Sequence, residues 1–258
     1  SCLTLSKIRS VLGRIAKTLR VDPSLRSGMP PRSGAAAIPT PGIERSRTDR
    51  ARRPLKAATV GTLFVRAGRN KAAMAFLEEA VQEAESAPGG PGSGLAEAAM
   101  ELGRLHVILS EGDPGKAQAL LRRAAGLYEQ SGSNRDLAGA LMLLGLAGER
   151  LGDFGEAEAV LWKARAAIGQ SAPEDLLRGS VTVNLGRICI SQHKADEAEP
   201  LFTEALSVFE KEDPSQSSNA AVALNGLGLV HNERGRYSAA IPLFEKALSI
   251  FQAVHGPD

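Results

Sequence analysis

The stretch ALNGLGLVHNERGRYSAAIPLFEKAL, residues 223–248, decides the fold of this chain. It holds a Leu-Gly pair at 227–228, and the spaced residues Ala240, Phe244 and Ala247 follow it, beginning 12 residues after the glycine. Apolar residues at intervals of three and four on either side of a polar turn predict two packed helices. Small residues let the two backbones approach closely, and the large residue between the alanines fills the remaining gap.

Similar signatures recur upstream at a nearly constant period. The Leu-Gly pairs are spaced by 42, 41 and 42 residues and lie at Leu102-Gly103, Leu144-Gly145, Leu185-Gly186 and Leu227-Gly228, and Val60-Gly61 extends the series one step earlier. One helix pair cannot bury both of its faces, whereas stacked pairs share a continuous core. The sequence therefore predicts an all-α fold: a right-handed superhelical solenoid of about five antiparallel helix pairs, preceded by a basic, mostly unstructured N-terminal arm.

The expected domains follow from this period. The arm comprises residues 1–53 and the solenoid residues 54–258, with repeat copies at about 54–87, 95–131, 136–171, 174–212 and 217–255. Pro54, Pro114, Pro173 and Pro214 are expected at helix starts, where a missing N–H donor is harmless. Asp113, Asp153 and Asp213 are expected as N-caps. The slot of the large residue late in each first helix holds Gly148 in the third copy, which predicts loose packing there.

Leu-Gly followed by Ala, a large residue and Ala resembles the tetratricopeptide repeat. The long period, the motifs Glu199-Pro200-Leu201 and Ile241-Pro242-Leu243, and the closing residues 255–258 resemble the kinesin-light-chain-like subclass. The resemblance covers about 200 residues and is specific to the repeat architecture. It implies a protein-binding scaffold whose first helices line a concave groove.

The arm differs sharply from the rest in charge. Residues 1–56 hold 13 Lys and Arg against three acids, a net charge of +10, and the remainder carries −8. Apolar residues at helical spacing between Leu5 and Leu19 predict a basic amphipathic helix, and the proline-rich stretch 22–53 predicts no fold of its own. This composition is typical of a mitochondrial or chloroplast transit peptide, which is either cleaved or retained and bound.

No catalytic, cofactor or metal motif is evident in the sequence. Cys2 and Cys189 share no metal-ligand spacing with a histidine, and no nucleophile is paired with a base. His106, His231 and Cys189 occupy equivalent first-helix positions and are expected to be packing residues. The longest apolar run, 137–148, is too short to cross a membrane. We therefore expect a non-enzyme without cofactor, bound metal or transmembrane span.

The partner-binding groove is predicted at Arg104, Asn184, Arg187 and Asn225. The resemblance implies that Asn184 and Asn225 hold a peptide backbone by donating and accepting hydrogen bonds. Arg104 and Arg187, with Arg150 further along its helix, favour an acidic segment as the partner. Ala58 and Thr62 stand where chaperone-binding repeats carry their carboxylate-gripping residues, which disfavours a chaperone co-factor role.

Three functions remain open at this point. The first is an organellar assembly factor or accessory subunit of a larger complex, located in the mitochondrion or chloroplast. The second is a cytosolic kinesin-light-chain-like cargo adaptor. The third is a ribosome- or RNA-associated protein that contacts nucleic acid only through the basic arm.

Overall fold

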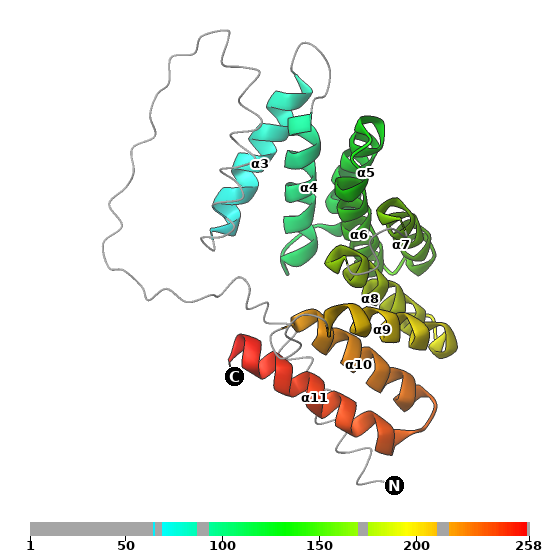
Figure 1. Cartoon of the computed structure of the whole chain (residues 1–258). Coiled ribbons are helices and arrows are strands. Elements are labelled where there is room, and N and C mark those ends of the chain that lie inside the picture. The colour runs from blue at the N-terminus through cyan, green and yellow to red at the C-terminus, as the bar shows by residue number, and fades with distance from the viewer. Residues whose placement is uncertain (1–63, 65–68, 87–92, 170–174, 211–216, 257–258) are drawn as a thin grey trace, which may run out of the picture.

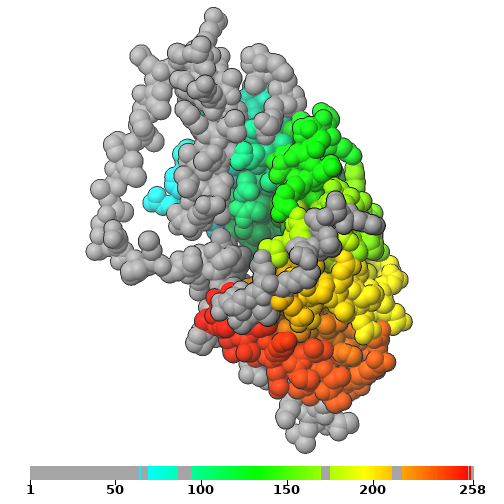
Figure 2. Space-filling view, viewed as in Figure 1, coloured from blue at the N-terminus to red at the C-terminus, as the bar shows by residue number. Residues whose placement is uncertain are grey.

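The computed structural model describes residues 64, 69–86, 93–169, 175–210 and 217–256, and every regular element within these ranges is a helix. The arm, residues 1–53, and the first helix of the first copy lie outside them. The helices are α3 (Asn70–Glu85), α4 (Ser93–Ile108), α5 (Pro114–Ser131), α6 (Asn134–Leu151), α7 (Phe154–Ile168), α8 (Leu176–Ser191), α9 (Ala195–Phe209), α10 (Ser218–Glu233) and α11 (Tyr237–His255). They follow one another as a stack from α3 to α11 (Figures 1 and 2).

The helices associate in sequential pairs. Extensive contacts join α4 to α5, α6 to α7, α8 to α9 and α10 to α11, and each pair also packs on the next, with α5 on α6 as closely as the helices within a pair. α3 packs on α4 as the second helix of the first copy. The predicted all-α solenoid of helix pairs is confirmed.

The predicted contact between a small and a large residue is present in each of these four pairs. A Cβ atom added to the glycine of the Leu-Gly pair would lie 2.4–2.8 Å from the large side chain of the following helix, and the contacts are Gly103 with Leu121, Gly145 with Leu161, Gly186 with Phe202, and Gly228 with Phe244. All four large side chains are fully buried. Because no real Cβ could occupy these places, glycine sets the distance between the paired helices.

The expectation of loose packing at Gly148 is wrong. A Cβ at this position would lie 3.2 Å from the Cβ of Ala157 and 3.4 Å from the carbonyl oxygen of Asp153. The absence of a side chain lets α6 and α7 approach until their backbones meet, so the glycine closes the space that a large residue would otherwise fill.

Successive first helices form one continuous layer. α4 contacts α6, α6 contacts α8, and α8 contacts α10, whereas successive second helices approach each other less closely. In a curved stack the layer with the closer neighbours lies on the inside. We therefore name α4, α6, α8 and α10 the inner layer, and α3, α5, α7, α9 and α11 the outer layer.

Ion pairs join neighbouring helices of the outer layer. Lys163 on α7 pairs with Glu129 on α5 at 3.0 Å, and Arg165 on α7 pairs with Glu204 on α9 at 2.7 Å. Arg123 on α5 pairs with Glu85 on α3. Long charged side chains therefore span the wider outer spacing that direct helix contact does not close.

The helix ends agree with the sequence in part. Asp113 caps α5 by accepting from the N–H groups of Gly115 and Lys116, and Asp153 caps α7 by accepting from Glu156. However, α8 begins at Leu176 with Asp175 as its N-cap, and α10 begins at Ser218 with Ser217 as its cap. Pro173, Asp213 and Pro214, which the sequence places at these helix starts, lie outside the described residues. None of the described helices is long and apolar enough to span a membrane.

Candidate functional site

All four predicted groove residues lie on inner-layer helices. Arg104 is on α4, Asn184 and Arg187 are on α8, and Asn225 is on α10. Three of them meet near the α8/α10 junction, as the contacts below show. Arg104 lies two repeats away from this group.

Arg104 is engaged within its own helix. Its guanidinium pairs with Glu101 one turn earlier at 2.7 Å. Glu97, a further turn back, has a raised carboxyl pKa because burial disfavours its charge and because Glu101 and Asp136 are negatively charged neighbours. This end of the inner layer is therefore acidic, and Arg104 does not stand there as an unpaired cation.

Arg187 connects two repeats. Its Nη2 donates to Oε1 of Glu149 on α6 at 2.7 Å, and its Nη1 donates to Oδ1 of Asn184 at 3.0 Å. The Nδ2 of Asn184 donates to the carbonyl oxygen of Ser180. The predicted groove residues Asn184 and Arg187 are thus partnered within the chain, which holds them in one orientation before any ligand arrives.

Asn225 lies in a cavity of about 380 Å³ between α8 and α10, which we name the α8/α10 cavity. The lining residues are Glu149, Arg187, Ile190, Ser191, Phe202, Val222, Asn225, Gly226 and Leu229. The Oδ1 atom of Asn225 is buried and has no hydrogen-bond partner among the described residues. A buried acceptor without a donor costs free energy unless a donor from outside the described residues reaches it.

Arg150 has a structural role that the sequence did not reveal. Its Nη1 donates to the carbonyl oxygens of His106, Val107 and Leu109 at 2.8, 2.6 and 3.3 Å. These carbonyls belong to the end of α4 and the turn after it, where intrahelical donors run out. Arg150 therefore closes the end of α4, and it adds nothing to the expectation of an acidic partner.

His106 and Cys189 are packing residues, as expected. His106 is only 5% exposed, and its Nδ1 accepts from the backbone N–H of Asp113 at 3.2 Å. Burial lowers the pKa of His106, and the nearby Lys116 ammonium lowers it further. Both effects favour a neutral imidazole.

One group of potential metal ligands, which the sequence did not indicate, meets across three helices. The ligand atoms of Glu158, Cys189 and Glu197 all lie within 4.8 Å of one another. Burial, with the nearby carboxylates of Glu158 and Glu197, raises the pKa of the Cys189 thiol to about 11. The ammonium of Lys194 pairs with Glu158 at 3.0 Å. The carboxylate of Glu158 therefore already has a cationic partner within the chain.

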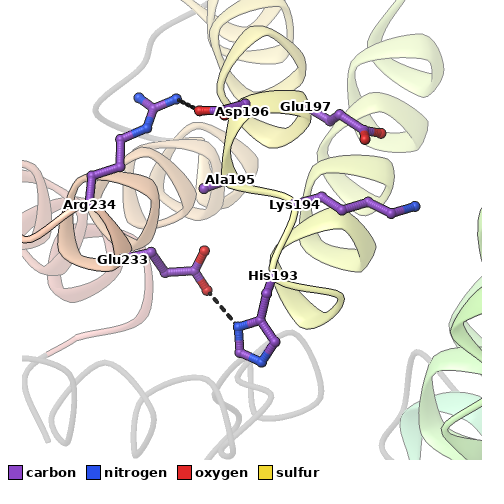
Figure 3. Close-up of a pocket in the computed structure, with 7 residues that line it drawn as sticks. All are labelled: His193, Lys194, Ala195, Asp196, Glu197, Glu233 and Arg234. Atoms are coloured by element: carbon purple, nitrogen blue, oxygen red, sulfur yellow. Dashed lines mark hydrogen bonds and ion pairs between the residues drawn. The ribbon is translucent and has the colours of Figure 1, made fainter.

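A second cavity, of about 500 Å³, lies where the turn between α8 and α9 meets the end of α10 (Figure 3). Two ion pairs lie among its lining residues. Arg234 binds Asp196 at 2.6 Å, and Nδ1 of His193 lies 3.4 Å from Oε1 of Glu233 (Figure 3). Arg234 also pairs with Glu199, and Lys194 pairs with Glu158, so these cations already have partners within the chain.

Sequence reasoning missed the partner of Arg187 and the apolar part of the α8/α10 cavity. Glu149 lies 38 residues from Arg187, and the two meet only because α6 and α8 are neighbours in the inner layer. Ile190, Val222 and Leu229 resemble core residues in the sequence, yet each stays partly exposed beside the cavity. The one available signal is Gly226, a second glycine beside the Leu-Gly pair at 227–228.

The chain matches models of the tetratricopeptide repeat family at residues 136–211 and again at 220–258. A curated relative, Protein KINESIN LIGHT CHAIN-RELATED 2 of Arabidopsis thaliana, is 24% identical over 186 residues, which are 71% of this chain and 28% of that protein. The chain therefore spans less than a third of the length of this relative.

Solved structures show the same fold. A Podosopora anserina crystal structure of kinesin light chain nearly identical TPR-like repeats superposes with a TM-score of 0.64 at 17% identity and covers 79% of this chain and 96% of its own. A Rap protein, solved in complex with Competence and Sporulation Factor, gives a TM-score of 0.63 at 14% identity over 80% of this chain and 57% of its own. Identities this low establish the fold alone.

Proposed function

We propose that this chain, a tetratricopeptide repeat protein, is a non-enzymatic scaffold that holds a segment of a partner protein in the α8/α10 cavity. Proteins of this repeat are in general scaffolds for protein–protein interaction, and the described residues contain no pairing of a nucleophile with a base that would suggest a reaction. The Rap protein of the same fold is itself complexed with a factor.

A single observation carries the choice of this surface: the buried, unpartnered Oδ1 of Asn225 beside the ordered side chains of Arg187 and Asn184. An extended segment carries one N–H and one C=O per residue, and these can meet the amide of Asn225 in both directions. Because Glu149 and Asn184 fix the orientation of Arg187, a ligand would not have to order that side chain.

Alanine at both Asn184 and Asn225 tests this surface. The double variant should fold nearly as well as the wild type, because Asn225 Oδ1 has no partner among the described residues to lose, and Arg187 keeps its bond to Glu149 when its bond to Asn184 is removed. Partner capture should weaken by about 1–3 kcal/mol. The measurement is affinity purification of the tagged full-length chain, with the bound proteins quantified by mass spectrometry.

The matched control replaces Lys163 and Lys246 by alanine in the outer layer, where both side chains are exposed. Capture that survives the Asn184 and Asn225 changes but fails with the control, or with deletion of residues 1–53, would show that recognition uses the outer layer or the arm.

For the cellular role, we propose an organellar assembly factor or accessory subunit of a larger complex. The support is the +10 charge and the amphipathic pattern of the N-terminal segment. Fusion of residues 1–20 to a fluorescent reporter tests it: the reporter should enter a mitochondrion or chloroplast. A reporter that remains in the cytosol would favour the alternative, a kinesin-light-chain-like adaptor, to which the Arabidopsis relative points by its name.

A further inference from the structure

We infer that the α8/α10 cavity takes an uncharged, apolar anchor residue of an extended partner segment, and that the backbone N–H beside this anchor donates to Oδ1 of Asn225. The inference rests on the proposed function and specifies the chemistry of the partner. It differs from the acidic partner that the arginines alone suggest.

The charges at the rim of the cavity cancel. The guanidinium of Arg187 lies 2.7 Å from the carboxylate of Glu149, and its remaining bond to Asn184 holds it in that position. An incoming carboxylate would meet the negative charge of Glu149, and an incoming ammonium would meet the positive charge of Arg187. Either would also lose its hydration, so the rim disfavours both signs of charge.

Five of the nine residues that line the cavity are apolar. Phe202 and Gly226 lie among its lining residues, together with Ile190, Val222 and Leu229, which remain partly exposed. Covering these aliphatic side chains with an apolar residue removes hydrocarbon surface from water, which is the main driving force available in such a cavity.

Gly226 makes this junction different from its neighbours. The residue directly before the Leu-Gly pair is Glu101, Leu143 and Asn184 in the three preceding copies, and it is glycine only here among the described copies. A Cβ at Gly226 would lie 2.3 Å from Cε1 of Phe202. The bare backbone therefore lets α10 settle on the Phe202 ring and leaves the adjoining space without a side chain.

The unpartnered acceptor determines how an anchor residue would be oriented in the cavity. Oδ1 of Asn225 has no donor among the described residues, and Arg187, which also lines the cavity, donates to Glu149 and Asn184 and not to Asn225. A backbone N–H next to an apolar side chain supplies the donor without bringing a net charge. One residue of an extended segment thus satisfies both the apolar floor and the amide.

A displayed library of random peptides, about 12 residues long, selected on the full-length chain tests the inference. Selected peptides should share one aliphatic or aromatic residue with uncharged neighbours. Their affinity, measured by fluorescence anisotropy, should change less than about threefold between roughly 50 and 500 mM NaCl, because no net charge is recognised.

Three variants locate the peptide. Asn225→Ala should weaken binding about tenfold, and Val222→Thr, which keeps the side-chain shape but not its apolar character, should weaken it several-fold. Glu149→Gln leaves Arg187 without its counter-charge, so a selected peptide whose anchor is changed to Asp should bind this variant about tenfold better than it binds the wild type. Lys163→Ala is the control and should bind like the wild type, and circular dichroism checks that each variant is folded.

Acidic peptides selected on the wild type, with binding lost at high salt and in Arg187→Gln, would overturn this inference while leaving the proposed function intact. A selection in which no peptide depends on Asn225 or Val222 would overturn both.

Discussion

At the α4/α6 junction, the inner layer carries Glu97, Glu101 and Arg104, and the arginine pairs within its own helix at 2.7 Å. At the α8/α10 junction, Arg187 instead reaches back to Glu149 on α6, and Asn225 keeps a buried acceptor without a partner among the described residues. Both junctions rest on the same contact between a glycine and a large residue. The repeat therefore fixes the packing, while the few inner residues around the Leu-Gly pair decide the surface chemistry.

The largest loss of stability is expected from Phe202→Ala, which tests whether the α8/α10 junction depends on this ring. The ring is fully buried and lies against both Gly186 and Gly226, so its loss would leave a cavity beneath two inner helices. Urea unfolding should show a loss of about 3–5 kcal/mol. The exposed change Glu245→Ala should stay within about 0.5 kcal/mol. Equal losses in the two variants would mean that Phe202 is not the residue on which the junction rests.

A second prediction compares a helix glycine that is packed against an aromatic ring with one that has open space around it. Gly226→Ala should destabilise the chain by about 1–3 kcal/mol, because its Cβ would meet the Phe202 ring at 2.3 Å. Gly139→Ala in α6 is the matched control. Nothing lies within 4 Å of a Cβ there, so helix propensity alone should stabilise the chain by about 0.5–1 kcal/mol. If both variants shifted the melting temperature in the same direction, this difference between the two glycines would be contradicted.

A third effect compares two inner-layer arginines. Arg150→Ala removes the donor to three carbonyls at the end of α4 and should cost about 1–3 kcal/mol in urea unfolding. Arg104→Ala removes an i,i+3 ion pair that is partly open to solvent, and should cost no more than about 1 kcal/mol. The opposite order would show that Arg104, and not Arg150, is the structural residue.

The smallest effect is a pH dependence at His106. The folded pKa is lowered, so the unfolded chain binds the proton more readily, and stability should fall as the pH drops below the ordinary value of 6.5. Protonation also removes the acceptor for the Asp113 N–H. His106→Asn offers an acceptor that does not titrate, so its urea midpoint should decline less than that of the wild type between about pH 7.5 and 5.5. A parallel decline in both proteins would contradict this assignment.

The sequence determined the repeat, the helix pairs and the packing contacts, because each depends on residues within one period. Gly186 and Phe202, for instance, belong to one copy, and their sizes alone require them to meet. The caps Asp113 and Asp153 were equally readable, since a cap acts on residues two or three positions away.

Only the tertiary structure decided which polar groups find partners. Arg150 reaches carbonyls more than 40 residues away, Arg187 meets Glu149 at a separation of 38, and Oδ1 of Asn225 finds no partner in the part of the chain that the structure describes. These outcomes depend on how closely one repeat stacks on the next, as at Gly226, where the bare backbone of α10 lies against the Phe202 ring of the preceding copy. The period of the sequence specifies that the helices stack, and only their packed arrangement specifies which side chains then lie within hydrogen-bonding distance.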